Sequence, residues 1–210
     1  MAVSTTHHLK ARRHLARRDP VLKRLVASVG HCTLQYEDNR FAALARSIIS
    51  QQISTKAALA IRTRLEKALG RRGLTPAAIL ALSDEALHNA GLSASKQKSL
   101  RDLARHVHGG LVRLDAIPEL EDEDVIAALI PIRGIGRWTA QMFLIFSLGR
   151  LDVLPVDDFG LRAGVMEQYG LAELPDRTRL TEMAEPWQPY RSIATWYIWR
   201  SRGFVPRSGD

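Results

Sequence analysis

Cysteine is almost absent from this 210-residue chain, and its scarcity excludes several kinds of site. Because Cys32 is the only cysteine, the chain can form neither an intramolecular disulfide nor a cysteine zinc site, and it cannot hold a four-cysteine iron–sulfur cluster. Apolar runs of about 18 residues are missing too, and no cleavable apolar segment follows the N-terminal basic residues. We therefore expect an intracellular protein that does not enter a membrane.

Strand patterns are also missing, since no segment sustains an alternation of polar and apolar residues. Apolar residues recur instead at helical spacing, as in the segment 41–49. Capping residues, prolines and glycines mark where helices begin and end. The sequence predicts an all-α protein with helices at about 20–29, 39–51, 55–69, 76–82, 84–90, 95–108, 122–130, 137–148, 158–169, 177–185 and 190–201.

Positive charge is in excess, with 30 Lys and Arg against 22 Asp and Glu and a formal net charge of +8. A polyanion is therefore the first partner to consider, although charge alone does not distinguish DNA, RNA and anionic lipid. We interpret residues 1–18, which are rich in Lys, Arg and His, as a basic N-terminal arm. A solvated, frayed terminus is the alternative.

The most informative segment joins two predicted helices through Gly134-Ile135-Gly136, which predicts a helical hairpin at about 122–148. Glycines at 134 and 136 favour a turn with positive φ, and they lack the side chains that would keep a phosphate away. The N–H groups of the helix that begins near Arg137 favour an anion. Such a turn would bind a phosphate without reading a base. An ordinary helix end followed by a turn is the alternative.

Two carboxylates, Asp157 and Asp158, lie at the predicted start of the helix at 158–169. Aspartate is a favourable N-cap residue. The helix dipole also favours a negative charge at this end, which suits a carboxylate that stabilises a cation or orients water. Capping and catalysis are compatible roles, and both remain open at this point.

Aromatic residues concentrate near the C-terminus, where five of them lie from Trp187 to Trp199, in a segment that also carries Arg191, Arg200 and Arg202. Aromatic side chains at helical spacing usually form a core. The alternative is that one or two of them line a pocket for a flat, electron-poor ring, together with Trp138.

Taken together, these segments resemble the helix-hairpin-helix DNA glycosylases, specifically the 3-methyladenine DNA glycosylase II (AlkA-like) branch. The resemblance extends from about Asp19 to Pro206. It rests on residues 46–54, 132–140, 156–158 and 186–192, and on the separation of 24 residues between Gly134 and Asp158. It implies a two-lobed helical bundle with a helix-hairpin-helix motif and a central cleft, formed by residues 19–210 as one or more domains.

The resemblance implies a monofunctional glycosylase of base excision repair that flips alkylated purines, of the 3-methyladenine and 7-methylguanine type, and hydrolyses their N-glycosidic bonds. Asp158 is the implied catalytic residue, and Asp157 is structural. Relatives that also cut the strand use a lysine where this chain has Trp138, so no lyase activity is expected. A glycosylase for another damaged base, or a non-catalytic helix-hairpin-helix DNA-binding module, is the alternative.

The resemblance also assigns further site residues. The base pocket would be lined by Trp138, Trp199, Phe159 and Met142. DNA would be bound by Gly134, Gly136, Arg137, Thr139, Gln52 and the wedge-loop residues Ser93, Ala94 and Lys96. The backbone carbonyls of Ile130, Ile132 and Ile135 would hold a Na⁺ or K⁺ ion that faces a phosphate, while no other cofactor is required.

This chain departs from the family pattern at three positions. Arg133 stands where the hairpin usually has proline, Ala94 is small where the wedge residue is often larger, and Met142 stands where an aromatic residue is sometimes found. The expected partner is damaged double-stranded DNA, bound by a monomer in the cytoplasm or nucleoid of a bacterium or in the nucleus of a eukaryote.

Overall fold

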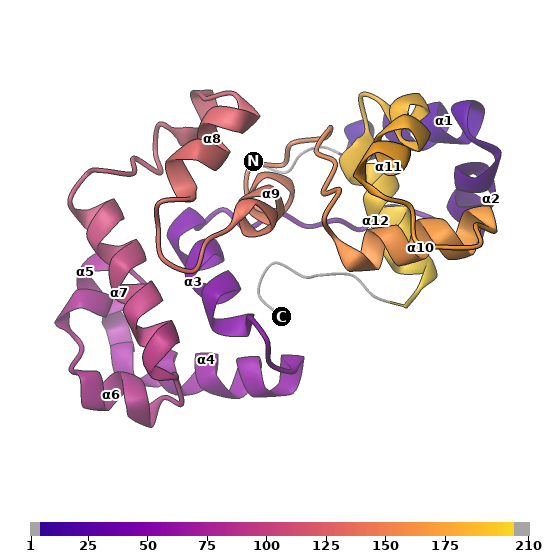
Figure 1. Ribbon diagram of the computed structural model, residues 1–210. Helices are drawn as coiled ribbons and strands as arrows, with labels where there is room; N and C mark the ends of the chain where they lie inside the picture. Colours follow the sequence, from indigo (N-terminus) through magenta and orange to yellow (C-terminus); the bar gives the residue numbers. More distant parts are fainter. Residues whose placement is uncertain (1–4, 204–210) are drawn as a thin grey trace. The chain divides into compact units, whose positions relative to one another are not determined.

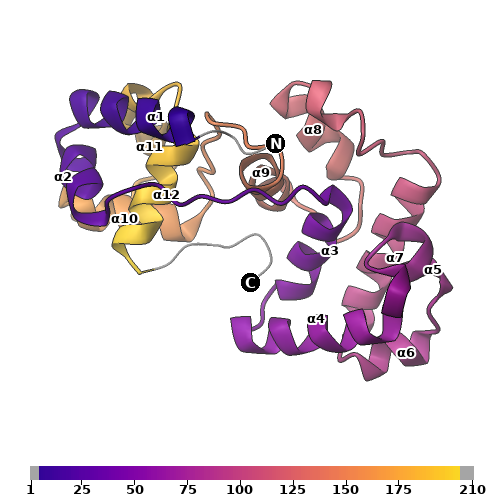
Figure 2. The same ribbon diagram turned by 180° about the vertical axis from the view of Figure 1, so that it is seen from behind.

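The computed structural model describes residues 5–203, which form two compact units (Figures 1 and 2). Within these residues the first unit comprises 5–36 and 144–203, and the second comprises 37–143. All regular structure between residues 5 and 203 is helical, which confirms the predicted all-α class. Over the same residues, no helix has the length and apolar character needed to cross a membrane.

The first unit is built around its last helix. Its elements are α1 (Thr5–Arg18), α2 (Pro20–Val29), α10 (Phe159–Tyr169), α11 (Arg177–Met183), the 3-10 turn η3 (Glu185–Trp187) and α12 (Arg191–Ser201). Every side chain from Ser192 to Trp199 is buried, because α12 packs against α1, α2 and α10 (Figure 2). The aromatic residues near the C-terminus therefore belong to the core of this unit.

The prediction of a basic arm at 1–18 is wrong over residues 5–18, which form the packed helix α1. Ala11 and Leu15 are completely buried on its inner face. These few apolar residues pack α1 against the rest of the unit, while most of the basic side chains of α1 stay exposed. Residues 1–4 of the predicted arm lie outside the described residues.

A buried carboxylate, Asp19, joins three elements of the first unit. Its Oδ1 atom accepts hydrogen bonds from the N–H groups of Val21 and Leu22, at 2.8 and 2.9 Å, which caps α2. Its Oδ2 atom accepts hydrogen bonds from the Tyr169 hydroxyl at the end of α10 and from the Trp187 indole N–H in η3. Burial, followed by contact with this carboxylate, raises the pKa of Tyr169. Asp19 therefore satisfies four donors from three separate parts of the sequence.

The second unit contains α3 (Arg40–Ser50), α4 (Thr55–Leu69), η1 (Gly70–Arg72), α5 (Pro76–Ala81), α6 (Asp84–Asn89), α7 (Ala94–His108), η2 (Ile117–Glu119) and α8 (Asp122–Leu129). The remaining helix, α9 (Arg137–Phe146), continues across the boundary between the units, at residues 143 and 144. The predicted helices from 20–29 to 190–201 are all present, with boundaries close to those expected from their caps and glycines.

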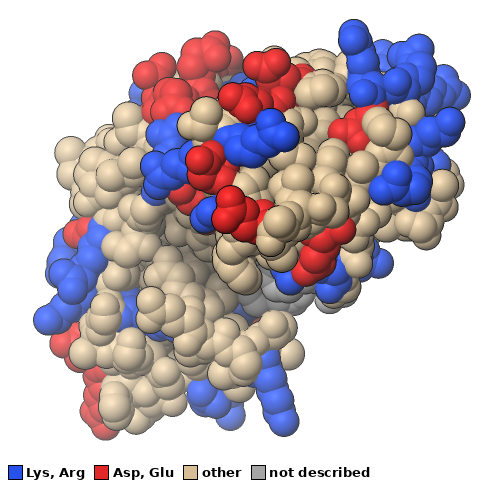
Figure 3. Space-filling model, turned by 45° about the vertical axis from the view of Figure 1, so that its right-hand side comes forward, with Lys and Arg blue, Asp and Glu red and all other residues tan. Residues whose placement is uncertain are grey.

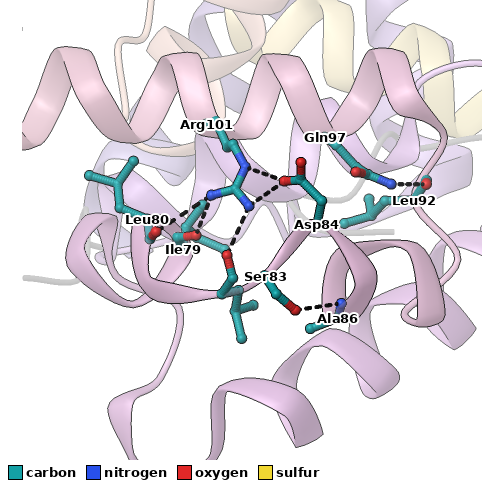
Figure 4. A network of polar contacts seen from close by, with 9 residues as sticks. Ile79, Leu80, Ser83, Asp84, Ala86, Leu92, Gln97 and Arg101 are labelled. Atoms are coloured by element: carbon teal, nitrogen blue, oxygen red, sulfur yellow. Dashed lines mark hydrogen bonds and ion pairs between the residues drawn. The ribbon is translucent and has the colours of Figure 1, made fainter.

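An arginine on α7 organises the short helices of the second unit (Figure 4). The Arg101 guanidinium donates to the Leu82 carbonyl at 2.8 Å and forms an ion pair with Asp84 at 2.6 Å. Ser83 caps α6 through the Ala86 N–H group, at 3.1 Å. Because the donors of Arg101 satisfy carbonyls at the end of α5, the α5–α6 connection is fixed against α7.

A buried histidine, His8, is expected to make the stability of the first unit depend on pH. His8 lies 2.9 Å from the Tyr36 hydroxyl, and burial lowers its pKa below the ordinary value of 6.5, an effect that a backbone hydrogen bond with Cys32 only partly offsets. The unfolded chain therefore binds this proton at a higher pH than the folded chain, so stability should fall as the pH drops below about 6.5.

We expect His8→Gln to reduce this loss of stability between pH 7.5 and pH 5, as measured by denaturant unfolding of the full chain at each pH. The exposed His88 provides the control, because His88→Gln replaces an exposed imidazole and not a buried one. An equal pH dependence in the His8→Gln variant and the wild type would contradict this assignment.

Candidate active site

Asp158 occupies the N-terminus of α10, where its carboxylate is held by the backbone. The residue has extended φ and ψ angles of −70° and 114°, and its side chain accepts a hydrogen bond from the Leu161 N–H group at 2.5 Å. Only 7% of the residue is exposed. The predicted N-cap role is therefore present, and it fixes a nearly buried carboxylate at the positive end of a helix dipole.

A second donor to Asp158 comes from α12. The indole Nε1–H of Trp199 donates to the same Oδ1 atom at 2.8 Å. Trp199 is completely buried, and its ring stacks against Phe146 with centroids 6.0 Å apart and planes 15° apart. The prediction that Trp199 lines a base pocket is not tested by this contact and stays a prediction.

The two neighbours of Asp158 differ from it in their surroundings. Asp157 forms an ion pair with Arg177 of α11, at 2.6 Å, in keeping with its predicted structural role. Phe159 leaves 66% of its surface exposed, so an apolar ring directly follows the carboxylate. Its assignment to a base pocket stays a prediction.

The hairpin lies in the second unit between α8 and α9, and Gly134 is the residue that lets it turn. Gly134 has a φ of +82°, and a Cβ atom there would lie 2.8 Å from Ser99 Oγ on α7. Its carbonyl accepts a hydrogen bond from Gln51 Nε2 at 2.8 Å. Positive φ and the close approach of α7 both require glycine at this position.

Gly136 differs from the prediction, because it does not adopt a positive φ. A Cβ atom at Gly136 would meet nothing within 4 Å. The second glycine of the motif is thus needed neither by the backbone conformation nor by packing within the protein. An open surface directly before α9 is what a closely approaching ligand would require.

Arg133, which stands at the usual proline position, contributes a backbone contact that proline could not make. Its N–H group donates to Asp102 Oδ2 on α7 at 2.8 Å, and proline has no N–H group. The hairpin turn is therefore supported by three residues from earlier helices and their ends: Gln51, Ser99 and Asp102. The sequence analysis identified none of them. No local sequence signal distinguishes them, because they contact the turn across 31 to 83 residues.

The first turn of α9 carries an arginine that is already ion-paired. The Arg137 guanidinium binds the Glu123 carboxylate of α8 through two nitrogens. Trp138 is 39% exposed, whereas Thr139 and Met142 are buried. Figure 3 shows both basic and acidic side chains at the surface. The predicted contacts of these residues with DNA or a flipped base remain predictions.

Gln52 and the predicted wedge loop are connected through the end of α3. Gln52 is exposed and is the one non-glycine residue with positive φ, +59°, among the described residues. The Lys96 ammonium donates to the Ile49 carbonyl at 2.6 Å, and burial lowers the pKa of Lys96. Ser93 caps α7, and Ala94 is exposed beside it. A strained, exposed backbone at Gln52 is typical of a functional position.

The turn also contains the carbonyls that were predicted to hold a cation. The Ile132 carbonyl accepts a hydrogen bond from the Ile135 N–H group at 3.0 Å. The side chains of Ile132 and Ile135 are buried, while Ile130 is 46% exposed. Because a carbonyl oxygen has two lone pairs, this hydrogen bond is compatible with an ion ligand on Ile132.

The comparisons with known proteins agree on one family. The model of the HhH-GPD superfamily base excision DNA repair protein matches residues 45–189. DNA-3-methyladenine glycosylase 1 of Schizosaccharomyces pombe is 37% identical over 202 residues, which cover 91% of this chain and 86% of that protein.

Two solved structures are similar over nearly the whole chain. A 3-methyladenine DNA glycosylase of Schizosaccharomyces pombe in complex with abasic DNA aligns with a TM-score of 0.82 and 36% identity, covering 93% of this chain and 98% of its own. A DNA-3-methyladenine glycosidase of Bacillus halodurans aligns with a TM-score of 0.83 and 37% identity, covering 92% and 89%.

Proposed function

This chain belongs to the HhH-GPD superfamily of base excision DNA repair proteins, and on that premise we propose that it is a DNA glycosylase that excises alkylated purines. The observation that carries the proposal is the nearly buried Asp158 carboxylate, held by two donors at the start of α10. The names of the relatives at 37% and 36% identity supply the class of base, of the 3-methyladenine type. The substrate is damaged double-stranded DNA.

Asp158 performs the chemistry as an electrostatic stabiliser. An alkylated purine such as 3-methyladenine or 7-methylguanine carries a positive charge and leaves readily, so no general acid has to protonate it. Breaking the bond from the base to C1′ places positive charge on the deoxyribose, which a fixed carboxylate stabilises. The same carboxylate orients the water that then adds to C1′. The products are the free base and an abasic site.

Access to the bond requires that the nucleotide leaves the base stack. Flipping costs a few kcal/mol for a paired base and less for a damaged one, which gives part of the selectivity before chemistry. Phosphate binding at the Gly134–Gly136 turn and at basic side chains offsets this cost and makes the affinity depend on salt. The protein acts as a monomer, in the cytoplasm or nucleoid of a bacterium or in the nucleus of a eukaryote.

The enzyme is monofunctional. A lyase would need an amine to form a covalent Schiff base with C1′ of the sugar, and Trp138 stands at the position where lyase-active relatives carry lysine. A Na⁺ or K⁺ ion fits the carbonyls of Ile130, Ile132 and Ile135, because carbonyl oxygens suit these cations. When bound, the ion would supply a positive charge for a DNA phosphate.

The test is incubation of the full chain with methylated duplex DNA, followed by chromatography of the released bases. We expect 3-methyladenine and 7-methylguanine in the soluble fraction, an intact strand at the abasic site and no borohydride-trapped adduct. Tight DNA binding without release of any base would favour the DNA-binding module. Release of oxidised guanine with strand cleavage would favour a lyase-active glycosylase.

The two hairpin glycines should respond differently to alanine. Gly136→Ala should fold normally, because its φ is ordinary and its surroundings are open, but it should weaken binding to abasic-site DNA about tenfold by keeping a phosphate away. Gly134→Ala should lower the unfolding free energy by about 1 to 3 kcal/mol, since φ is +82° and Ser99 lies in the way.

Fluorescence anisotropy and denaturant unfolding measure the two quantities on the same preparations. If the Gly136→Ala variant bound DNA as tightly as the wild type, no phosphate would approach closely at that glycine. Wild-type stability of Gly134→Ala would show that the hairpin can rearrange around the added methyl group.

A further inference from the structure

Two donors from different helices converge on one oxygen of the proposed catalytic carboxylate. The Leu161 N–H group belongs to α10 itself, whereas the Trp199 indole belongs to α12, and both donate to Asp158 Oδ1. We propose that Trp199 is a positioning residue that sets the orientation of the Asp158 carboxylate, and that Gly160 supplies the space this contact needs. The inference rests on the proposed function of Asp158.

The second donor restricts a motion that the first one allows. An N-cap hydrogen bond holds one oxygen near the backbone but leaves the side chain free to pivot about that contact. A second donor, fixed on another helix, restricts the pivot and defines the plane of the carboxylate. A carboxylate that acts on C1′ has to be held to within a fraction of an ångström, which supporting hydrogen bonds achieve.

Trp199 is itself immobilised, as a positioning residue has to be. Its side chain is completely buried, and Phe146 stacks against its ring with centroids 6.0 Å apart. Burial and stacking leave the ring little freedom to rotate. Its polar N–H group donates to the one carboxylate to which the reaction is assigned.

Gly160 lies in the first turn of α10, next to this contact. A Cβ atom at Gly160 would lie 3.1 Å from Asp158 Oδ1 and 3.5 Å from Trp199 Nε1. The φ of Gly160 is ordinary, so the backbone would accept alanine, and alanine favours a helix more than glycine does. The added methyl group would therefore press on the Asp158–Trp199 contact without straining the helix.

The first experiment compares Trp199→Phe with Trp196→Phe, a matched loss of a buried indole on the same helix. Trp196 is 2% exposed and packs against Tyr197. We expect Trp199→Phe to lower the single-turnover rate of base release by about 10- to 100-fold with unchanged binding to abasic-site DNA. Trp196→Phe should keep the wild-type rate. Equal effects in both variants would overturn the proposal.

Gly160→Ala keeps the proposal testable if Trp199→Phe folds poorly. We expect this variant to unfold at the wild-type denaturant concentration or a higher one, and to release base several-fold more slowly. A variant as stable and as active as the wild type would show that the Asp158–Trp199 contact does not need glycine at position 160.

A double-mutant cycle separates positioning from general damage. If Trp199 acts through Asp158, Trp199→Phe should have no further effect on the residual rate of Asp158→Asn. Independent, multiplicative losses would overturn the positioning role. Wild-type activity of Asp158→Asn would instead remove the proposed role of Asp158, whereas an inactive Asp158→Asn beside a fully active Trp199→Phe would refute this inference alone.

Discussion

Replacement of Asp158 with asparagine is expected to lower the single-turnover rate of base release by about 10³-fold, because a fixed negative charge beside the developing cation is lost. Asparagine is nearly isosteric, and it remains a favourable N-cap residue. Its amide oxygen can still accept hydrogen bonds from Leu161 and Trp199. The variant therefore isolates the charge, and its affinity for duplex DNA should be unchanged or higher.

Asp176→Asn is the matched control for Asp158→Asn. Asp176 also caps a helix of the first unit, α11, by accepting from the Arg179 N–H group at 2.8 Å, but it is exposed. This control should keep the wild-type rate of release of 3-methyladenine and 7-methylguanine. If Asp158→Asn released base as fast as Asp176→Asn, another group would have to stabilise the cation.

Asp19→Ala is expected to give the largest loss of stability, about 3 to 5 kcal/mol of unfolding free energy. The substitution removes the cap of α2 and leaves the donors of Tyr169 and Trp187 without their acceptor in a buried site. Denaturant unfolding followed by tryptophan fluorescence measures the loss, since Trp187 is itself one of the donors.

Asp19→Asn should fall between the alanine variant and the wild type. Asparagine can cap α2 with its carbonyl oxygen, but its NH₂ group would face the Trp187 N–H group, which can only donate. Asp176→Ala, at an exposed cap, should cost about 1 kcal/mol. Comparable losses for Asp19→Ala and Asp176→Ala would show that the contacts with Tyr169 and Trp187 contribute little.

Helices could be predicted closely because their ends carry local chemical signals. Asp19-Pro20 caps α2, and Thr75-Pro76 begins α5. Helix α1 was missed because its inner face consists mainly of Ala11, Leu15 and a buried histidine, and this gives a weak apolar period. A short apolar face becomes recognisable only when the surface that covers it is known.

The site was predictable only where its residues carry local chemical signals. The N-cap position of Asp158 follows from its place before a helix, whereas its contact with Trp199 joins positions 41 residues apart and has no local signal. From the sequence alone, Gly134 and Gly136 cannot be distinguished, because a positive φ and the close approach of a ligand both favour glycine. The three-dimensional structure shows that the fold requires glycine at position 134 but not at position 136.

The Arg137–Glu123 ion pair leads to an expectation about ionic strength, on the premise that Arg137 contacts a DNA phosphate as predicted. A phosphate that takes the place of Glu123 releases cations from the DNA, but the displaced carboxylate then attracts a cation from solution. On that premise, the net exchange of small ions at this contact would be close to zero. The slope of log affinity against log salt would then count fewer phosphate contacts than the protein makes. Glu123→Gln removes the carboxylate that would attract this cation, so it should steepen the slope.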